Sequence, residues 1–455
     1  MTAIASIRKD RRPAKGAVLL WTAALIAAGL AIAVALVATQ RDGSGAARVR
    51  SAADEAAARE ARIAFFEQRA AADPIDFLSL NALTGQYLQR ARETGDVADY
   101  RRAEAAATKS LDLVPVDNYG GLIGLAAVRL VQHDFAAVES LANDAMALKP
   151  YEAAPYGLLA DAQVGLGRYD EASDTLAAMV EIEAGLPALS RLAHLAFLRG
   201  DELNAVEFWR QAIEAGEVGA TATTPVENLA WAHVQLGVTY FALGDLDKAA
   251  SQHAAALSLF PDYVHALAAL GQVRAAEQRW DQAAALYERA VARMPQPQYV
   301  AALGDVYAVA GRKAEATGQY ALVEAIAALY RDGGINTDLQ IALFYADHDL
   351  ELPLALGIAR AAFEAAPGVH AADALAWALY KNGEYEDAAA FSEQARAWGT
   401  PEAGFYFHAA LISHALGDDD TAREQLQRAL DLNPRFAPLQ AEQAQALQAE
   451  LEASR

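Results

Sequence analysis

Short segments with apolar residues at helical spacing alternate with turns that contain Gly, Asp or Pro, from about residue 75 to residue 435. This pattern predicts helices joined in pairs by tight turns. Within the pairs, small residues recur at fixed places, where a neighbouring helix can approach closely. Proline follows the second helix of several pairs and predicts its end.

The pattern has a period of 34 residues. Gly237, Ala249, Ala256 and Pro261 are followed 34 residues later by Gly271, Ala283, Ala290 and Pro295, and Gly383 and Gly417 show the same spacing. Less regular copies fill the gaps, and about ten units are expected in all. Non-helical segments at residues 217–224 and 332–336 interrupt the series.

A period of 34 residues with this helix–turn–helix pattern resembles the tetratricopeptide repeat family. The resemblance implies an all-α, right-handed superhelical solenoid whose first helices line a concave face. The first break predicts an N-terminal array at residues 51–220 and a C-terminal array at residues 225–435. The polar segment 436–455 is expected to form a capping helix.

Residues 16–39 contain no charged side chain. As a helix they would extend about 36 Å, enough to cross a bilayer core of about 30 Å. The tail at residues 1–15 is basic, which predicts a cytoplasmic N-terminus and a single-pass protein of the cell membrane. Residues 40–50 then form a flexible stalk, and the repeats lie in the periplasm or on the outer surface. A cleaved signal peptide and a buried helix of a soluble protein are the alternatives.

Composition narrows the possible functions. The chain has a formal net charge of −22, which argues against nucleic acid as a partner, and it has no cysteine. No phosphate-binding loop, nucleophile elbow or His-Glu-x-x-His motif occurs, so we expect no enzyme, no cofactor and no metal site. We interpret Asp347-His348-Asp349 as a solvated turn and Asp418-Asp419-Asp420 as a helix cap.

The resemblance places candidate partner-binding residues on the first helices, facing the concave side. These candidates are His194, Phe197, Trp231, Phe241, His265, Gln272, Asp305, Phe344, Trp377, Tyr380 and Phe407. Aromatic residues at helical spacing are also typical of a core, and both interpretations stay open for each residue. This combination of aromatic, histidine and polar side chains favours an extended or helical segment of a membrane or exported protein as the partner.

Three functions are compatible with these features. The first is a membrane-anchored scaffold that binds proteins and aids assembly of a membrane or envelope complex. The second is a component of an envelope polysaccharide or cell-wall export machine. The third is a cytochrome c assembly factor, because residues 61–76 weakly resemble the lead-in of the membrane-anchored repeat subunits in that pathway.

Overall fold

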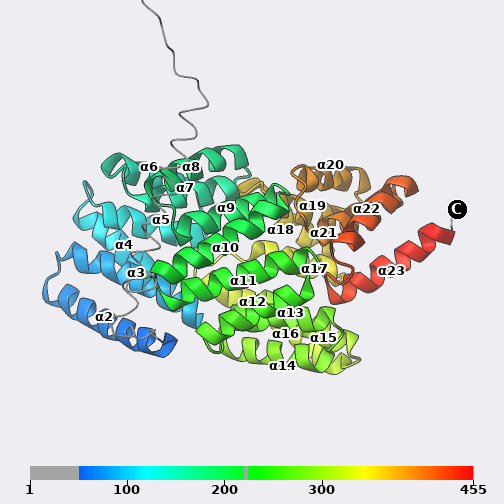
Figure 1. Cartoon of the computed structure of the whole chain (residues 1–455), viewed down its shortest axis with the longest axis horizontal. Helices are drawn as coiled ribbons and strands as arrows, with labels where there is room; N and C mark the ends of the chain where they lie inside the picture. Colours follow the sequence, from blue (N-terminus) through cyan, green and yellow to red (C-terminus); the bar gives the residue numbers. More distant parts are fainter. Residues whose placement is uncertain (1–50, 220–223, 454–455) are drawn as a thin grey trace, which may run out of the picture. The chain divides into compact units, whose positions relative to one another are not determined.

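The computed structural model describes residues 51–219 and 224–453, which belong to one compact unit. These described residues form 22 helices, α2–α23, and no strand (Figure 1). None of the helices described is both long and apolar enough to cross a membrane. The predicted membrane segment 16–39 and its flanks, residues 1–15 and 40–50, lie outside the described residues.

Ten helical hairpins follow α2 (Ala52–Ala72), as the sequence period predicts, and α23 (Pro438–Ala453) ends the described fold. The first helices of the hairpins are α3 (Phe77–Thr94), α5 (Tyr119–Val131), α7 (Ala153–Gly165), α9 (Leu186–Leu198), α11 (Val226–Ala242), α13 (Val264–Ala276), α15 (Pro297–Val309), α17 (Asp338–Asp347), α19 (Val369–Lys381) and α21 (Ala403–Ala415). The second helices are α4 (Val97–Leu113), α6 (Phe135–Leu148), α8 (Tyr169–Ile182), α10 (Glu202–Gly219), α12 (Leu246–Leu259), α14 (Trp280–Arg293), α16 (Lys313–Asp332), α18 (Leu352–Ala365), α20 (Tyr385–Arg396) and α22 (Asp419–Leu432).

Close helix crossings within the hairpins confirm the role expected for the small residues. A Cβ atom on Gly237 would lie 2.3 Å from Cε1 of His253, and one on Gly304 would lie 2.3 Å from Cε1 of Tyr320. In each of these two hairpins, a ring of the second helix therefore packs directly on the backbone of the first helix. The absence of a side chain at these two positions permits the crossing.

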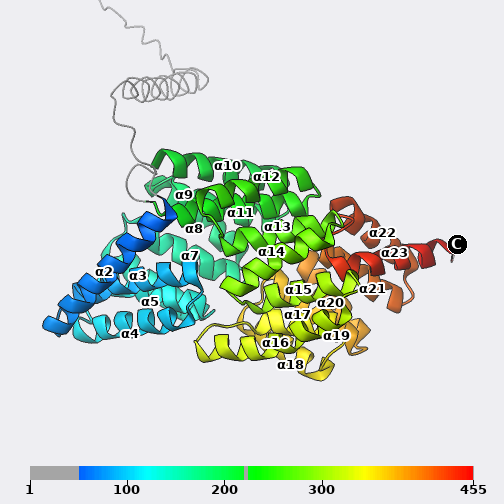
Figure 2. The same ribbon diagram turned by 90° about the horizontal axis from the view of Figure 1, so that it is seen from below.

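Hairpins about 200 residues apart in the sequence lie side by side (Figures 1 and 2). The hydroxyl of Tyr169 accepts a hydrogen bond from the backbone N–H of Val369 at 3.0 Å. Two loop side chains donate to carbonyls at the ends of first helices: Thr400 to Leu198 at 2.5 Å and Asn433 to Phe241 at 2.8 Å. We call these contacts the turn-to-turn seam, because they join one turn of the superhelix to the next.

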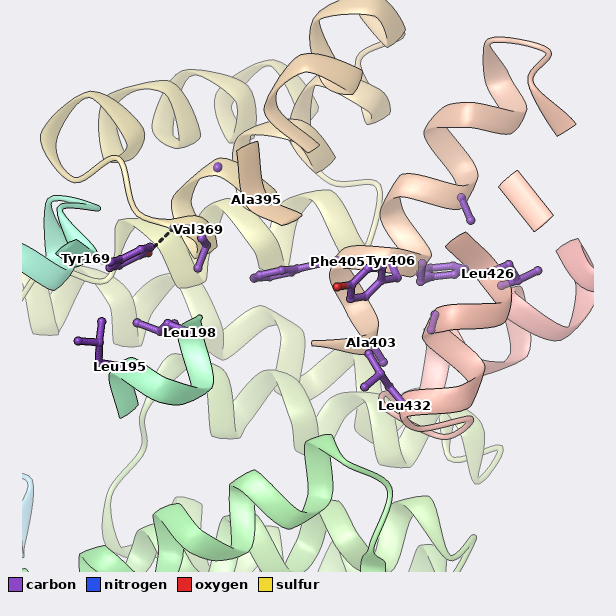
Figure 3. Close-up of a cluster of buried hydrophobic side chains, with 14 of the residues drawn as sticks. Tyr169, Leu195, Leu198, Val369, Ala395, Ala403, Phe405, Tyr406, Leu426 and Leu432 are labelled. Carbon is purple, nitrogen blue, oxygen red and sulfur yellow. Dashed lines mark hydrogen bonds between the residues drawn. The ribbon is translucent and has the colours of Figure 1, made fainter. Parts of the chain in front are cut away.

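The seam has an apolar core as well as hydrogen bonds. Figure 3 shows Leu195 and Leu198 of α9 on one side, and Val369 and Phe405 of the C-terminal hairpins on the other. All four are less than 9% exposed. A fully buried side chain of this size contributes roughly 1.5–3 kcal/mol relative to an exposed one. The seam is therefore part of the main hydrophobic core. A simple open solenoid, in which each repeat contacts only its neighbours, would have no such contact between turns.

The seam brings backbone so close that it depends on glycine. Gly200 follows α9 with a φ of 72°, and a Cβ atom there would lie 2.6 Å from the carbonyl oxygen of Gly399. Gly383 ends the corresponding turn after α19 with a φ of 81°, but a Cβ atom there would meet nothing within 4 Å. Both glycines therefore have a left-handed backbone, but only Gly200 makes a close contact across the seam.

We predict that Gly200→Ala destabilises the protein more than Gly383→Ala. At either position, an alanine held in a left-handed backbone costs about 1–2 kcal/mol. Only the substitution at Gly200 must also push two backbone segments apart, which adds about 1–3 kcal/mol. Chemical denaturation of the two variants measures the difference. Equal losses of stability would show that the turns of the superhelix do not depend on this close approach.

The buried ring of His253 predicts a loss of stability in acid. It is 1% exposed, and burial lowers its pKa to about 4 from the usual 6.5. Since only the unfolded chain binds the proton between these values, stability should fall as the pH drops from about 6.5 to about 4, by up to about 3 kcal/mol. The variant His253→Gln should flatten this part of a stability–pH curve. An unchanged stability–pH curve in the His253→Gln variant would show that His253 does not cause the loss of stability in acid.

Candidate functional site

Three neighbouring first helices, α7, α9 and α11, line a cavity of about 470 Å³. Residues of α3, α8 and α10 complete its wall. Apolar, aromatic, charged and amide side chains all contribute: Arg92, Ala160, Asp161, Val164, Leu176, Leu186, Pro187, Ser190, Arg191, His194, Trp209, Glu227, Asn228, Trp231 and Gln235. We call this space the inner cavity.

An ion pair between α9 and α7 forms one side of the inner cavity. Nε and Nη2 of Arg191 donate to the two carboxylate oxygens of Asp161 at 2.9 and 2.7 Å. The guanidinium also donates to the backbone carbonyls of Gly157 and Pro187. A Cβ atom on Gly157 would lie 3.0 Å from Cζ of Arg191, so glycine leaves room for the side chain. The bidentate geometry fixes Arg191 and compensates its charge.

A second set of paired charges lies at the start of α11. Glu227 is buried and accepts hydrogen bonds from the hydroxyl of Tyr263 at 2.6 Å and from the amide of Gln89 at 3.2 Å. Nε of Arg92 lies 3.5 Å from the same carboxylate, and its side chain is half exposed. The network connects α3 to α11 and to Tyr263, the N-cap residue of α13. It therefore fixes this side of the inner cavity and leaves part of the Arg92 guanidinium accessible.

Two tryptophans provide the aromatic surface of the inner cavity. Trp209 of α10 is buried and Trp231 of α11 is half-buried. Their ring centroids lie 5.4 Å apart, with the planes inclined at 74°. This edge-to-face packing holds Trp231 in place while part of its ring stays open to the cavity.

His194 also lines a second cavity, of about 360 Å³. Residues of α6–α9 and α17–α19, with the turns before α6 and α17, line it, so it lies between successive turns of the superhelix. It contains His133, His194 and His370. Although all three side chains are exposed, the surrounding helices limit the hydration of the rings and thereby lower the pKa of each, and repulsion from His194 helps to bring that of His370 to about 4. At neutral pH the rings are therefore uncharged hydrogen-bonding groups.

This arrangement suits binding better than acid–base chemistry. The charges near the inner cavity are paired, and its accessible surface combines an indole, an imidazole and aliphatic side chains. Among the described residues, no group of three or more His, Asp or Glu side chains is placed to hold a metal ion. Apolar pockets with a few convergent polar groups are typical ligand-binding sites.

The structure brings only two of the predicted site residues, His194 and Trp231, into the inner cavity. Five others are buried in packing contacts: Phe197, Phe241, Phe344, Trp377 and Phe407. The remaining four are partly exposed elsewhere: His265, Gln272, Asp305 and Tyr380. Contact of any of these residues with a partner stays a prediction.

Sequence reasoning missed the charged residues of the inner cavity and Trp209. A signal for one of them exists, because Asp161 precedes Gly167 by the same six residues that separate His194 from Gly200. No comparable signal marks Trp209, which belongs to a second helix. Its access to the cavity depends on how neighbouring hairpins are rotated against each other.

The interpretation of Asp347-His348-Asp349 as a solvated turn is wrong for its first two residues. The carboxylate of Asp347 accepts a hydrogen bond from the indole of Trp377 at 2.9 Å. Nε2 of His348 lies 2.8 Å from the carboxylate of Asp305. Of the three residues only Asp349 is exposed, because Asp347 is the last residue of α17 and His348 is its C-cap, and both side chains point toward neighbouring helices. The capping role of Asp418 is confirmed, since its carboxylate accepts from the N–H of Thr421 at 3.1 Å.

Comparison with known proteins identifies the repeats. Residues 240–306 and 403–436 each match a model of the tetratricopeptide repeat. The chain therefore contains tetratricopeptide repeats, as its period predicts. No curated protein matches the chain.

A comparison with solved structures finds several chains that align with this one. The crystal structure of yeast Tom70 is 15% identical, with coverage of 83% of this chain and 96% of that chain and a TM-score of 0.32. The Cut9–Hcn1 hetero-tetramer of the APC/C is 13% identical, with the same coverages and a TM-score of 0.34. The MamA protein is 17% identical over 39% of this chain and 92% of its own, with a TM-score of 0.29.

Proposed function

We propose that this protein is a protein-binding scaffold that holds a segment of its partner in the inner cavity. Tetratricopeptide repeats generally bind protein partners, and two segments of the chain match models of this repeat. The scaffold aids the assembly of a membrane or envelope complex, and it carries out no reaction itself.

One observation supports the inner cavity as the binding site. Trp231 and His194 are accessible within it, although most aromatic residues at comparable places are buried. The neighbouring charges are already compensated by Asp161 and by Glu227. An apolar side chain of the partner could therefore enter without leaving a charge unpaired, which would otherwise be costly.

The charge-free segment 16–39 supports a location at the membrane. In this proposal the segment anchors the protein, and the short stalk keeps the repeats outside the cytoplasm and close to the bilayer. Confinement of the binding site near membrane-bound partners raises their effective concentration without any additional contact.

Trp231→Ala should reduce partner capture. Loss of the indole removes the main apolar contact of the inner cavity, and we expect at least a tenfold lower yield of the specific partner. The measurement is co-purification of the full chain from cells in mild detergent, followed by quantitative mass spectrometry. Tyr151→Ala removes an aromatic ring that is 68% exposed outside the cavity and serves as the control. Equal partner yields from both variants would place the binding site elsewhere.

A fusion experiment tests the location of the repeats. A reporter enzyme that is active only outside the cytoplasm, fused after Arg455, should be active because the positive flank of segment 16–39 holds the N-terminus inside. The same reporter fused to a chain that begins at residue 51 should be inactive. An intact but inactive full-length fusion would contradict the proposed topology and leave the inner cavity unaffected.

A further inference from the structure

The segment that leads from α22 into the first turn of α23 lies against side chains of two first helices, α17 and α21. Nε2 of Gln440, in the first turn of α23, donates to the carboxylate of Asp347 at 2.8 Å and lies 3.3 Å from Nε2 of His408. The ring of Phe436 packs at 5.6 Å from that of Phe407. We call residues 436–440 the tail segment, and the surface formed by α17, α19 and α21 the covered wall.

The covered wall is ordered by contacts among its own side chains. His408 stacks on Trp377 at 4.2 Å with the planes inclined at 10°, and Tyr380 stacks on the same indole at 5.1 Å and 7°. The indole donates to Asp347 at 2.9 Å, and His408 lies 3.0 Å from the carboxylate of Asp373. A surface held in this way loses little conformational freedom when a ligand binds.

The covered wall and the inner cavity use equivalent positions of the repeat. His194 and Trp377 each precede the glycine of their hairpin turn, Gly200 or Gly383, by six residues. In α9 this position faces a cavity, whereas in α19 the residue is 2% exposed beneath the side chains that surround it. The tail segment thus lies where the repeat pattern would place a bound ligand.

The tail segment and the residues before it make different kinds of contact. Asn433 is 2% exposed and donates to Phe241, and Arg435 donates to the carbonyl of Ala276 at 3.0 Å. These contacts belong to the turn-to-turn seam. Phe436 and Gln440 are only half-buried, and they contact the covered wall by side chains alone. The tail segment could therefore leave the wall while Asn433 and Arg435 hold the chain before it. The buried side chains Leu447 and Leu451 hold the later turns of α23 in the core.

We propose that the covered wall is a second binding surface, which the tail segment occupies as an internal ligand until a partner segment of the same chemistry displaces it. That partner carries an aromatic ring just before a helix and a carboxamide in the first turn of the helix, four residues later. The ring would replace Phe436 on Phe407, and the amide would donate to Asp347. This inference deepens the proposed scaffold function and rests on it.

A synthetic peptide of residues 433–447 with a fluorescent label serves as the probe. Because the tail segment competes with it, the peptide should bind the wild-type chain weakly. The full-length double variant Phe436→Ala/Gln440→Ala should bind it at least tenfold more tightly, by fluorescence anisotropy. A peptide that carries the same two alanines should lose at least tenfold in affinity for this variant.

The matched control is Glu442→Ala/Gln443→Ala, which changes two exposed side chains of α23 and should bind the peptide as weakly as the wild type. A folded Phe436→Ala/Gln440→Ala variant that binds no more tightly than this control would overturn the proposal. Addition of Trp231→Ala to that variant should leave peptide binding unchanged, because Trp231 belongs to the inner cavity. These measurements thereby distinguish failure of the proposed binding surface on the covered wall from failure of the proposed binding site in the inner cavity.

Hydrogen exchange provides a second test if the double variant does not fold. Excess unlabelled peptide should increase exchange in the first turns of α23 of the wild-type chain and leave α22 unchanged. The alanine-substituted peptide should have no effect. Unchanged exchange in α23 at saturating peptide would also overturn the proposal.

Discussion

Close backbone contact between successive turns of the superhelix is the constraint on which the rest of this structure depends. The turn at Gly200 meets the loop at Gly399, and Thr400 donates to the carbonyl of Leu198 at the end of α9. A helix-end carbonyl would otherwise need water or a cap. Asn433 donates to the carbonyl of Phe241, which also accepts from the N–H of Gly244. The seam therefore provides a hydrogen-bond partner at a helix end and buries apolar side chains at the same time. It also limits the space inside the superhelix.

The narrow interior gives equivalent repeat positions different roles. Where the tail segment covers α17, α19 and α21, Phe407 and Trp377 are buried. Where α7, α9 and α11 form the inner cavity, His194 and Trp231 face a space whose charges are compensated by ion pairs. The binding capacity that we propose for the inner cavity thus arises from a local departure from close packing, and the chemistry of the residues at these positions is only part of the cause.

The sequence predicts the hairpins well and the interior poorly. Gly237 and Gly304 indicate close crossings because each contact lies within one hairpin, where the 34-residue period fixes the geometry. The contact of Tyr169 with Val369 depends on the pitch of the whole superhelix, to which small rotations at every hairpin contribute. No pattern of neighbouring residues encodes that sum. Phe344 and Phe407 match the pattern of an exposed concave face and are nevertheless buried, because Tyr320 and His348 pack on the first and Phe436 packs on the second.

The seam also has an evolutionary consequence. In an open solenoid, the gain or loss of one repeat changes the length and leaves every other contact in place. Here, duplication of a repeat between Gly200 and Gly399 would move each loop away from the carbonyl that it now meets, along the entire seam. The copy number of the array is consequently fixed by its geometry, and homologues should vary by substitution within hairpins far more readily than by insertion of whole ones.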